Sequence, residues 1–543
     1  MNRATHSYWP ADTADPVLET TVGSVLRDAA DAAPDRTAIV AWTLAPGQRQ
    51  TWTYGALLRD AERSAWALLA RFEPGEHVAV YAPNSAEWLL LELAAGLAGI
   101  VLVTVNPANR ARELEYILRQ SQSAGLFHVG GFRGNPMSEW VEQVRPRLPG
   151  LREVRRFEEW PEFVNVAAGS GAMPIVRPGD AAQIQYTSGT TGSPKGALLH
   201  HRGLTNNARV YAELMALGDG DVYAHAMPFF HTAGCGLSTL GALQRCATHT
   251  FLPAFDPGRL LELLEQERAT HMMGVPTMLI AMLEHPNLGR HDLSALRVVS
   301  SGGASVAPEL VHAIESRLGV SFAVVYGQTE SSPLITQIRL DDASDDRANT
   351  VGRPIPQIEV KIINPGSGDI VPVGNVGELC TRGYHVMRAY FDKPDATAAA
   401  IDCDGWLRTG DLATMDARGY CRIVGRLKDM VIRGGENLFP AEIEAALIEH
   451  AAVMDAAVIG VPDRIMGEEL AAFIRCAESP PTVDALRAHV RVRLAGPKSP
   501  RYWVFLDEFP LTGSGKVQKF ILRERWARGE FQCIDAKSTR GAG

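Results

Sequence analysis

Hydrophobic and polar positions follow two alternating periods along most of the chain. From about Thr20 to Gly425, amphipathic runs of helical length alternate with short runs rich in β-branched and aromatic residues. Such alternation is typical of parallel sheets covered by helices. The most apolar run, Trp88 to Val105, contains Glu92 and two glycines. It therefore predicts a buried helix followed by a buried strand rather than a membrane span.

One βαβ unit is clear in the stretch LRVVSSGG, APELVHAIESRLG, VSFAVVYG. Its first part predicts a strand that ends in glycines, and its second part predicts a helix with Pro308 in the first turn and Gly319 after the end. The third part predicts the next strand. In parallel sheets, ligands bind beyond the carboxyl ends of the strands. We therefore expect the loops that begin at Ser301 and Gly327 on one rim, as candidate binding loops.

Shorter elements are predicted after residue 426. They are helices at residues 440–449, at 483–494 and after Val517, and a strand at 456–461. We expect an α/β protein with two domains. Residues 1–426 would form a large domain of parallel or mixed sheets covered by helices, and residues 427–543 a small, mobile α+β domain. The length of 543 residues agrees, because a single core stops growing at about 250–300 residues.

Composition and charge narrow the class of protein. Hydrophobic residues make up 46% and charged residues 21%, a balance that can bury a large core. The net charge is −9 and no dense Lys/Arg block occurs, so nucleic acid is excluded as a partner. Seven scattered cysteines without a CxxC pair favour a reducing, cytoplasmic setting. The N-terminus contains no apolar core of a secretory signal.

The stretch YTSGTTGSPKG, Tyr186 to Gly196, has the composition of a phosphate loop. Small residues let backbone N–H groups approach an anion, and Ser and Thr hydroxyls add donors. It is not a Walker A motif, because Gly196 follows Lys195 where that motif has the hydroxyl that holds magnesium. PLTGSGKVQK departs in the same way, with Val517 at that position. From composition alone, a surface connector explains the first stretch as well.

Five motifs in fixed order change this interpretation. They are YTSGTTGSPKG, YGQTE, DGWLRTGDL, GRLKDMVIRGGEN and PLTGSGK. Over nearly the whole chain they resemble the adenylate-forming superfamily of acyl-CoA synthetases, peptide-synthetase adenylation domains and firefly luciferase. The run from Asp404 to Met430 is most similar to the fatty-acyl-CoA synthetase branch. The resemblance implies that a carboxylate attacks the α-phosphate of Mg-ATP to give an acyl-adenylate, and that a thiol then displaces AMP.

The resemblance also implies a nucleotide site. The phosphate loop is expected to hold the β- and γ-phosphates through Thr187, Ser188, Gly189, Thr190, Thr191 and Lys195. The adenine is expected beside Gly302, Gly303, Ala304, Tyr326 and Gly327, and the ribose beside Asp411 and Arg426. Thr329 would contact the α-phosphate, and Glu330 would supply the magnesium ligand that the first loop lacks. Taken alone, Glu330 has a second interpretation as a solvated loop carboxylate, and Tyr326 as a core residue.

The remaining expectations concern the thiol and the acid. Lys516 resembles the lysine that bridges the attacking carboxylate and the α-phosphate, and Lys428 corresponds to the hinge between the domains. The resemblance places Gly434, Gly435 and Glu436 along the pantetheine tunnel, although a simple hairpin is an alternative for this stretch. His231 in MPFFHTAG resembles a histidine where the carboxylate and pantetheine channels meet, with a core histidine as the alternative. The adjacent His200 and His201 have no third ligand in view, so no metal site is expected there.

Together these features predict a ligase that uses ATP, Mg²⁺ and CoA to activate an aliphatic, medium- to long-chain carboxylic acid. A fatty-acyl-AMP ligase that loads a carrier protein is an alternative, although no appended carrier domain is evident. Two further alternatives are a luciferase-like oxidoreductase and a nucleotide-binding module without catalysis. The last is disfavoured because Glu330, Asp411 and Lys516 are all present. The identity of the acid and the oligomeric state stay open.

Overall fold

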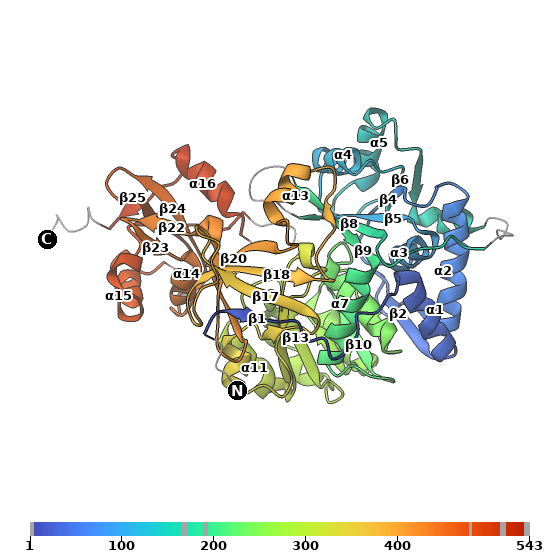
Figure 1. Ribbon diagram of the computed structural model, residues 1–543, viewed down its shortest axis with the longest axis horizontal. Coiled ribbons are helices and arrows are strands. Elements are labelled where there is room, and N and C mark those ends of the chain that lie inside the picture. Colours follow the sequence, from blue (N-terminus) through green and yellow to red (C-terminus); the bar gives the residue numbers. More distant parts are fainter. Residues whose placement is uncertain (1–4, 166–171, 188–193, 477–479, 511–516, 537–543) are drawn as a thin grey trace.

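The computed structural model describes residues 5–165, 172–187, 194–476, 480–510 and 517–536 (Figure 1). Within these residues the chain forms four sheets with helices packed around them. Two large mixed sheets come from the N-terminal part, a five-stranded antiparallel sheet follows, and a six-stranded sheet comes from the C-terminal part. In Figure 1 the five-stranded sheet lies between the C-terminal elements on the left and the large sheets on the right.

The seven-stranded sheet carries the phosphate-loop motif. Its order is β19 (Ala389–Tyr390), β9 (Lys195–His200), β8 (Ala181–Thr187), β5 (Val101–Val105), β4 (His77–Tyr81), β6 (Gly125–His128) and β7 (Glu153–Arg156). The five strands from β8 to β7 are parallel, while β9 and β19 add antiparallel pairs at one edge. The predicted helix and strand between Trp88 and Val105 are confirmed as α3 (Ala86–Ala98) and β5, with Gly99 at φ 69° ending the helix.

The nine-stranded sheet contains the predicted βαβ unit. Its order is β16 (Arg353–Pro354), β15 (Thr336–Gln337), β14 (Ser321–Tyr326), β13 (Val298–Gly302), β12 (His271–Met273), β10 (Val222–His225), β11 (Thr248–Phe251), β2 (Thr37–Trp42) and β3 (Arg49–Thr53). Strands β13 and β14 are parallel neighbours joined by α11 (Pro308–Leu318), as predicted. The loops after Gly302 and Tyr326 therefore begin on the same rim.

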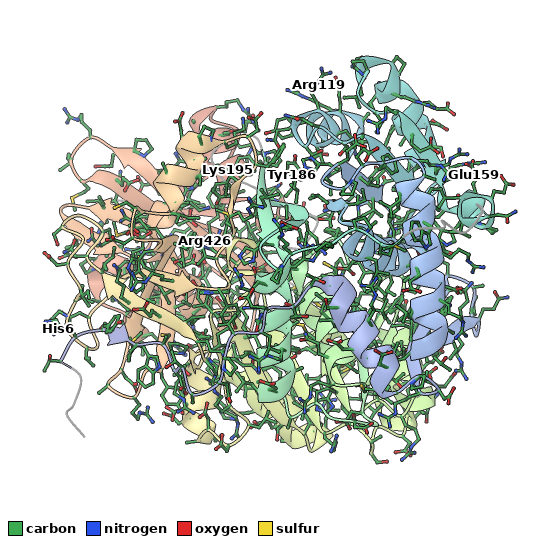
Figure 2. All side chains as sticks on the ribbon, turned by 45° about the vertical axis from the view of Figure 1, so that its right-hand side comes forward. His6, Arg119, Glu159, Tyr186, Lys195 and Arg426 are labelled. Atoms are coloured by element: carbon green, nitrogen blue, oxygen red, sulfur yellow. The ribbon has the colours of Figure 1, made fainter. Side chains whose placement is uncertain are left out.

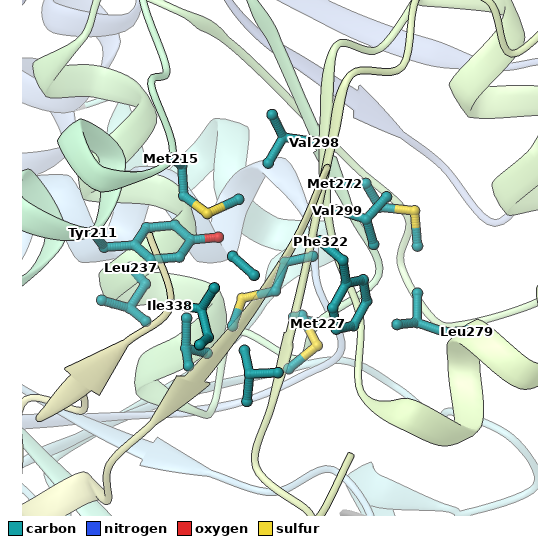
Figure 3. Close-up of a cluster of buried hydrophobic side chains, with 14 of the residues drawn as sticks. Tyr211, Met215, Met227, Leu237, Met272, Leu279, Val298, Val299, Phe322 and Ile338 are labelled. Carbon is teal, nitrogen blue, oxygen red and sulfur yellow. The ribbon is translucent and has the colours of Figure 1, made fainter. Parts of the chain in front are cut away.

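Helices cover the two large sheets. They are α1 (Val22–Ala32), α2 (Tyr54–Leu69), α3, α4 (Ala111–Gln120), α5 (Met137–Val144), α6 (Trp160–Val164), α7 (His201–Leu214), α8 (Gly241–Gln244), α9 (Pro257–Gln266), α10 (Pro276–Leu283), α11 and α12 (Ser344–Asn349). Figure 3 shows part of the core of the nine-stranded sheet, where Met272, Val299 and Phe322 pack with Tyr211 and Met215 from the α7 region. No helix in the described part of the chain is long and apolar enough to cross a membrane.

The alternation of helices and parallel strands ends earlier than the pattern predicted. After β14, the chain forms an antiparallel sheet in the order β1 (Tyr8–Trp9), β17 (Ile358–Ile363), β18 (Gly377–Gly383), β20 (Leu407–Met415) and β21 (Cys421–Arg426). Between β18 and β20 the chain also forms β19 of the seven-stranded sheet and the short α13 (Pro394–Ala400). The link between β20 and β21, residues 416–420, is too short for a crossover helix, so these two strands are antiparallel.

The C-terminal part forms its own sheet. Its order is β23 (Glu436–Leu438), β22 (Val431–Arg433), β25 (Gly467–Cys476), β26 (Tyr502–Phe505) and β27 (Ile534–Asp535), with β24 (Val453–Asp463) also paired to β25. The predicted helices and strand are present as α14 (Pro440–Ile448), α15 (Val483–Arg493), α16 (Lys519–Ala527) and β24. The other strands of this sheet were not predicted; β22, β23, β26 and β27 are too short to stand out from a loop, whereas β25 was missed despite its apolar run.

Candidate active site

Tyr326 and Asp411 come from different sheets and meet through a hydrogen bond. Tyr326 ends β14, and its hydroxyl donates to Asp411 Oδ2 over 2.9 Å. Arg426, the direct ladder partner of Asp411, brings its Nε to within 3.1 Å of Asp411 Oδ1. A carboxylate has about four acceptor positions, so two stay available for other donors. Burial, followed by the charge of Asp411, raises the pKa of Tyr326 well above its usual value, which keeps the hydroxyl a donor.

The rim beside Tyr326 is formed by backbone. Gly303 and Ala304, directly after β13, are exposed, whereas Gly302 is buried against Val325 of β14. Gly327 follows Tyr326, and a Cβ atom there would lie 1.8 Å from the Pro333 carbonyl oxygen. Only glycine fits at that position, because the returning chain crosses it so closely. A flat ligand could thus approach the backbone next to an aromatic ring.

Glu330 is almost completely buried and its carboxylate is oriented. It lies in the short turn Thr329–Ser331, with 8% of its surface exposed. Its Oε1 accepts a hydrogen bond from the Tyr390 hydroxyl over 2.6 Å. No described residue donates to Oε2. Thr329 is half-buried beside it. The interpretation of Glu330 as a solvated carboxylate is therefore wrong.

The two ends of the phosphate-loop motif are held together by a ladder. Thr187, the last residue of β8, pairs with Lys195, the first of β9, in antiparallel register. The Tyr116 hydroxyl donates to the Pro194 carbonyl over 2.8 Å and supports the second end. Figure 2 shows Tyr186, Lys195 and Arg426 in the middle of the molecule. Ser188, Gly189, Thr190 and Thr191 lie outside the described residues, so their role stays a prediction.

His231 lies in a loop that begins after β10 and enters a π-helix, η3 (Ala233–Leu240). Its carbonyl accepts from Gly234 and Cys235, and its ring centroid lies 4.5 Å from that of Phe230. The residue as a whole is partly exposed while its Nε2 is buried, and its place at a channel stays a prediction. Stretches of π-helix often occur at functional sites.

Asn84 holds the loop before His231. Its amide donates to the carbonyls of Met227 and Leu252, and its Oδ1 accepts from the Phe229 N–H. Sequence reasoning did not find this residue, because a single Asn after a strand is typical of any turn.

The stretch after β21 combines a short turn and a hairpin. Lys428 lies at the surface in the 3₁₀ turn η6 (Leu427–Asp429), between the five-stranded and six-stranded sheets. Protein atoms that crowd its ammonium, together with Arg426, lower the pKa of Lys428 to about 8. Gly434 and Gly435 form the two-residue turn between Arg433 and Glu436, both with positive φ. The hairpin geometry is confirmed, and the place of these residues along a pantetheine tunnel stays a prediction.

Lys516 lies outside the described residues. Its predicted catalytic role is therefore carried by the sequence motif.

His200 and His201 have structural roles. His200 Nδ1 accepts from the Gly203 N–H at the start of α7, and His201 Nδ1 accepts from the Val22 N–H. No group of three or more His, Cys, Asp or Glu residues within the described ranges is placed to hold a metal ion. A cation at Glu330 would thus need ligands from a bound substrate.

Comparison with known proteins shows the family of this chain. Residues 26–391 match the family described as AMP-binding enzyme, and residues 442–516 match the AMP-binding enzyme C-terminal domain. A Bacillus subtilis (strain 168) protein named "Putative acyl-CoA synthetase YngI" is 41% identical over 94% of this chain and 97% of its own length. The mitochondrial medium-chain acyl-CoA ligase ACSF2 of Homo sapiens is 35% identical over 96% of this chain and 90% of its own length.

Solved structures of similar proteins show the same fold over nearly the whole chain. ATP-bound MatB from Rhodopseudomonas palustris matches with a TM-score of 0.85 at 29% identity, over 94% of this chain and 99% of MatB. The apo form of MatB matches with a TM-score of 0.76 over the same shares. The overall arrangement is therefore more similar to the ATP-bound form. Family, relatives and fold agree: this chain belongs to the AMP-binding enzyme family and is an enzyme of the AMP-forming acid–CoA ligase type.

Proposed function

We propose that this enzyme uses ATP to convert a medium- to long-chain fatty acid into an acyl-adenylate, and then transfers the acyl group to CoA. The observation that carries the proposal is the arrangement of Tyr326, Asp411 and Arg426 beside the glycine rim. An aromatic ring held by a carboxylate with two remaining acceptor positions fits an adenine next to a ribose with two hydroxyls. Glu330 lies four residues beyond Tyr326, where the phosphates of such a nucleotide would follow.

Each of these residues has a defined task in the first step. Asp411 would accept from the ribose hydroxyls, and Thr187 and Lys195 would hold the β- and γ-phosphates at the ends of the phosphate loop. Thr329 would donate to the α-phosphate, where the acid attacks. Lys516 would bring positive charge to the attacking carboxylate and the α-phosphate, which is the kind of preorganised stabilisation that lowers such barriers.

The carboxylate at position 330 fits a magnesium ion. It is buried, one oxygen is already oriented by Tyr390, and the other has no donor among the described residues. Hard oxygen ligands of this kind, completed by substrate phosphates and water, are what Mg²⁺ prefers. Bound Mg²⁺ would neutralise phosphate charge. Glu330 would hold it through Oε2.

A surface pocket favours CoA over a carrier protein as the thiol donor. The pocket has a volume of about 340 Å³ and is lined by Phe132, Arg133, Phe255 and Arg259, among others. Phe132 follows β6 and Phe255 follows β11, so the pocket lies beyond the carboxyl ends of these strands. The loop of His231 also begins at the carboxyl end of β10, the parallel neighbour of β11. Arg133 donates to the Phe255 carbonyl and Arg259 to the Thr43 and Leu44 carbonyls. Their remaining N–H groups, together with the two rings, suit the nucleotide half of CoA, which a carrier-bound pantetheine lacks.

The thiol step would involve a second orientation of the C-terminal part. We place the domain boundary at Arg426/Leu427, where β21 ends and η6 begins, with Lys428 as the hinge. Rotation there would withdraw Lys516 and bring the Gly434–Glu436 hairpin toward the pantetheine. The cytoplasm suits this chemistry, and all seven cysteines are free.

One assay tests the proposal. The purified protein is incubated with ATP, Mg²⁺, CoA and aliphatic acids of 4 to 18 carbons, and the products are identified by mass. Acyl-CoA with AMP supports the proposal. Acyl-AMP that accumulates despite CoA would favour a carrier-loading ligase, and the absence of AMP with every acid would contradict an adenylating enzyme of this substrate class.

A further inference from the structure

We propose that Tyr390 is a positioning residue with two separable parts: its hydroxyl orients Glu330 toward the metal ion, and its ring supports the ammonium of Lys195. The inference rests on the proposed function, because it assumes that Glu330 and Lys195 serve one Mg-ATP. Tyr390 belongs to none of the five sequence motifs. It lies on β19, 60 residues after Glu330 and 195 residues after Lys195.

The hydroxyl acts on Glu330. It donates to Oε1 over 2.6 Å, a short bond of the kind that a charged acceptor makes. One of the two acceptor positions on Oε1 is therefore engaged by protein, and Oε2 accepts from no described residue. The orientation of the carboxylate thus favours binding of a cation through Oε2. Groups that orient a metal ligand in this way typically change metal affinity by about 10- to 100-fold when removed.

The ring acts on Lys195. The Lys195 Nζ lies over the Tyr390 ring, 5.0 Å from its centroid, within the range of a cation–π contact. Such a contact restricts a long, flexible side chain while leaving the N–H donors of the ammonium free for phosphate. Tyr390 therefore contacts both Glu330, the expected cation ligand, and Lys195, the expected phosphate ligand.

The backbone around Tyr390 is held firmly enough for this task. The Met387 N–H donates to the carbonyl of Glu330 itself, over 2.8 Å. Tyr390 is the ladder partner of Ala197 on β9, and the Phe391 N–H donates to the Gly196 carbonyl over 2.8 Å. The segment 387–391 is therefore bonded to the turn of Glu330 at one end and to the strand of Lys195 at the other.

Binding measurements without turnover separate the two parts. Mn²⁺ replaces Mg²⁺ as a spin probe, and an ATP analogue with a methylene group between the α- and β-phosphates prevents reaction. For Tyr390→Phe we expect Mn²⁺ affinity of the enzyme–analogue complex to fall about tenfold, and analogue affinity in EDTA to stay within about twofold of wild type. Tyr390→Leu also removes the ring, so analogue affinity in EDTA should fall about threefold or more.

Tyr8→Phe is the matched control, because the Tyr8 hydroxyl also donates to a glutamate, Glu359, over 2.6 Å. This variant should bind Mn²⁺ and the analogue like wild type.

A double mutant tests whether Tyr390→Phe acts through Glu330 or through a general change in the structure. In a Glu330→Ala background, Tyr390→Phe should cause no further loss of Mn²⁺ affinity, because the carboxylate on which the hydroxyl acts is gone.

Each outcome has a distinct meaning. Wild-type Mn²⁺ affinity in Tyr390→Phe, or an additive loss in the Glu330→Ala background, would overturn the role of the hydroxyl. Equal analogue affinities in EDTA for Tyr390→Phe and Tyr390→Leu would overturn the role of the ring. If the wild-type protein itself binds neither the analogue nor Mn²⁺, the proposed function fails, rather than the assignment of Tyr390.

Discussion

The hydroxyl of Tyr326 donates a hydrogen bond to Asp411 over 2.9 Å and thereby connects the nine-stranded sheet to the five-stranded sheet. The two residues are 85 positions apart in the sequence. Because Arg426 approaches the other oxygen of Asp411, the carboxylate is held from two sides. The candidate adenine and ribose contacts are therefore one rigid unit rather than two independent side chains.

Removing the Tyr326 hydroxyl tests this unit. Tyr326→Phe keeps the ring but loses a hydrogen bond to a charged acceptor, which is worth about 1.5 kcal/mol or more. We expect KM for ATP to rise about tenfold, with KM for the acid unchanged. Discrimination against 2′-deoxy-ATP should also weaken, because Asp411 is less firmly oriented. Steady-state kinetics with both nucleotides measures these effects, and an unchanged preference for ATP would argue against the unit.

Lys516 is expected to act in only one of the two half-reactions. Lys516→Ala should slow acyl-adenylate formation by about 10²-fold or more, because a charge that stabilises the transition state is lost. Thioester formation from supplied acyl-adenylate and CoA should stay near the wild-type rate. Pyrophosphate exchange measures the first half-reaction, and single-turnover consumption of acyl-adenylate measures the second. Equal losses in both would refute this role.

The pocket of Arg133 and Arg259 predicts selectivity for the nucleotide half of CoA. Replacing either arginine with Ser should raise KM for CoA about fivefold and leave KM for pantetheine unchanged, since pantetheine lacks the phosphates. Adenylation without a thiol should proceed normally. Arg63→Ser, in a separate pocket of about 440 Å³, is the control and should leave both thiols unaffected. Parallel loss with CoA and pantetheine would indicate a different position for the nucleotide.

Glu92 predicts how stability depends on pH. It is buried on α3, where Gln183 donates to its Oε1 over 2.7 Å, and burial raises its pKa to about 8. The folded protein then binds a proton that the unfolded chain releases above about pH 4.5. The contribution of Glu92 to the stability of the folded state therefore decreases as pH rises from about 4.5 to about 8, by at most about 1.4 kcal/mol per pH unit.

Substitution of Glu92 checks the sign of that dependence. Glu92→Gln can still accept from Gln183 but does not ionise, so relative to wild type it should gain about 2 kcal/mol between pH 6 and pH 8. Urea unfolding at the two pH values measures this gain. Glu19→Gln is the control. The pKa of Glu19 is lowered by Arg202, so both its folded and unfolded forms are ionised throughout that range. A constant difference between Glu92→Gln and wild type would contradict a protonated Glu92.

Several elements could be predicted from the sequence because their signals are local. The apolar run from Trp88 to Val105, with Gly99, predicted a helix and a strand. Apolar runs with Pro308 and Gly319 predicted the unit from β13 to β14. The five-stranded sheet was not readable, since its strands resemble those of a parallel sheet in composition. Their direction depends on which sheet edges meet in the folded chain, because β18 and β20 are antiparallel although their connection is long enough to contain α13.

The sequence by itself determined which chemical groups this protein has: a glycine- and hydroxyl-rich loop, a glutamate after YGQT, an aspartate in TGD and a lysine in GSGK, in a recognisable order. Only the tertiary structure decided which of them act together. Tyr326 with Asp411, and Tyr390 with Glu330 and Lys195, are pairs whose members lie 60 or more residues apart. Such contacts depend on how sheets pack and where their edges meet, and no local pattern of residues encodes that geometry.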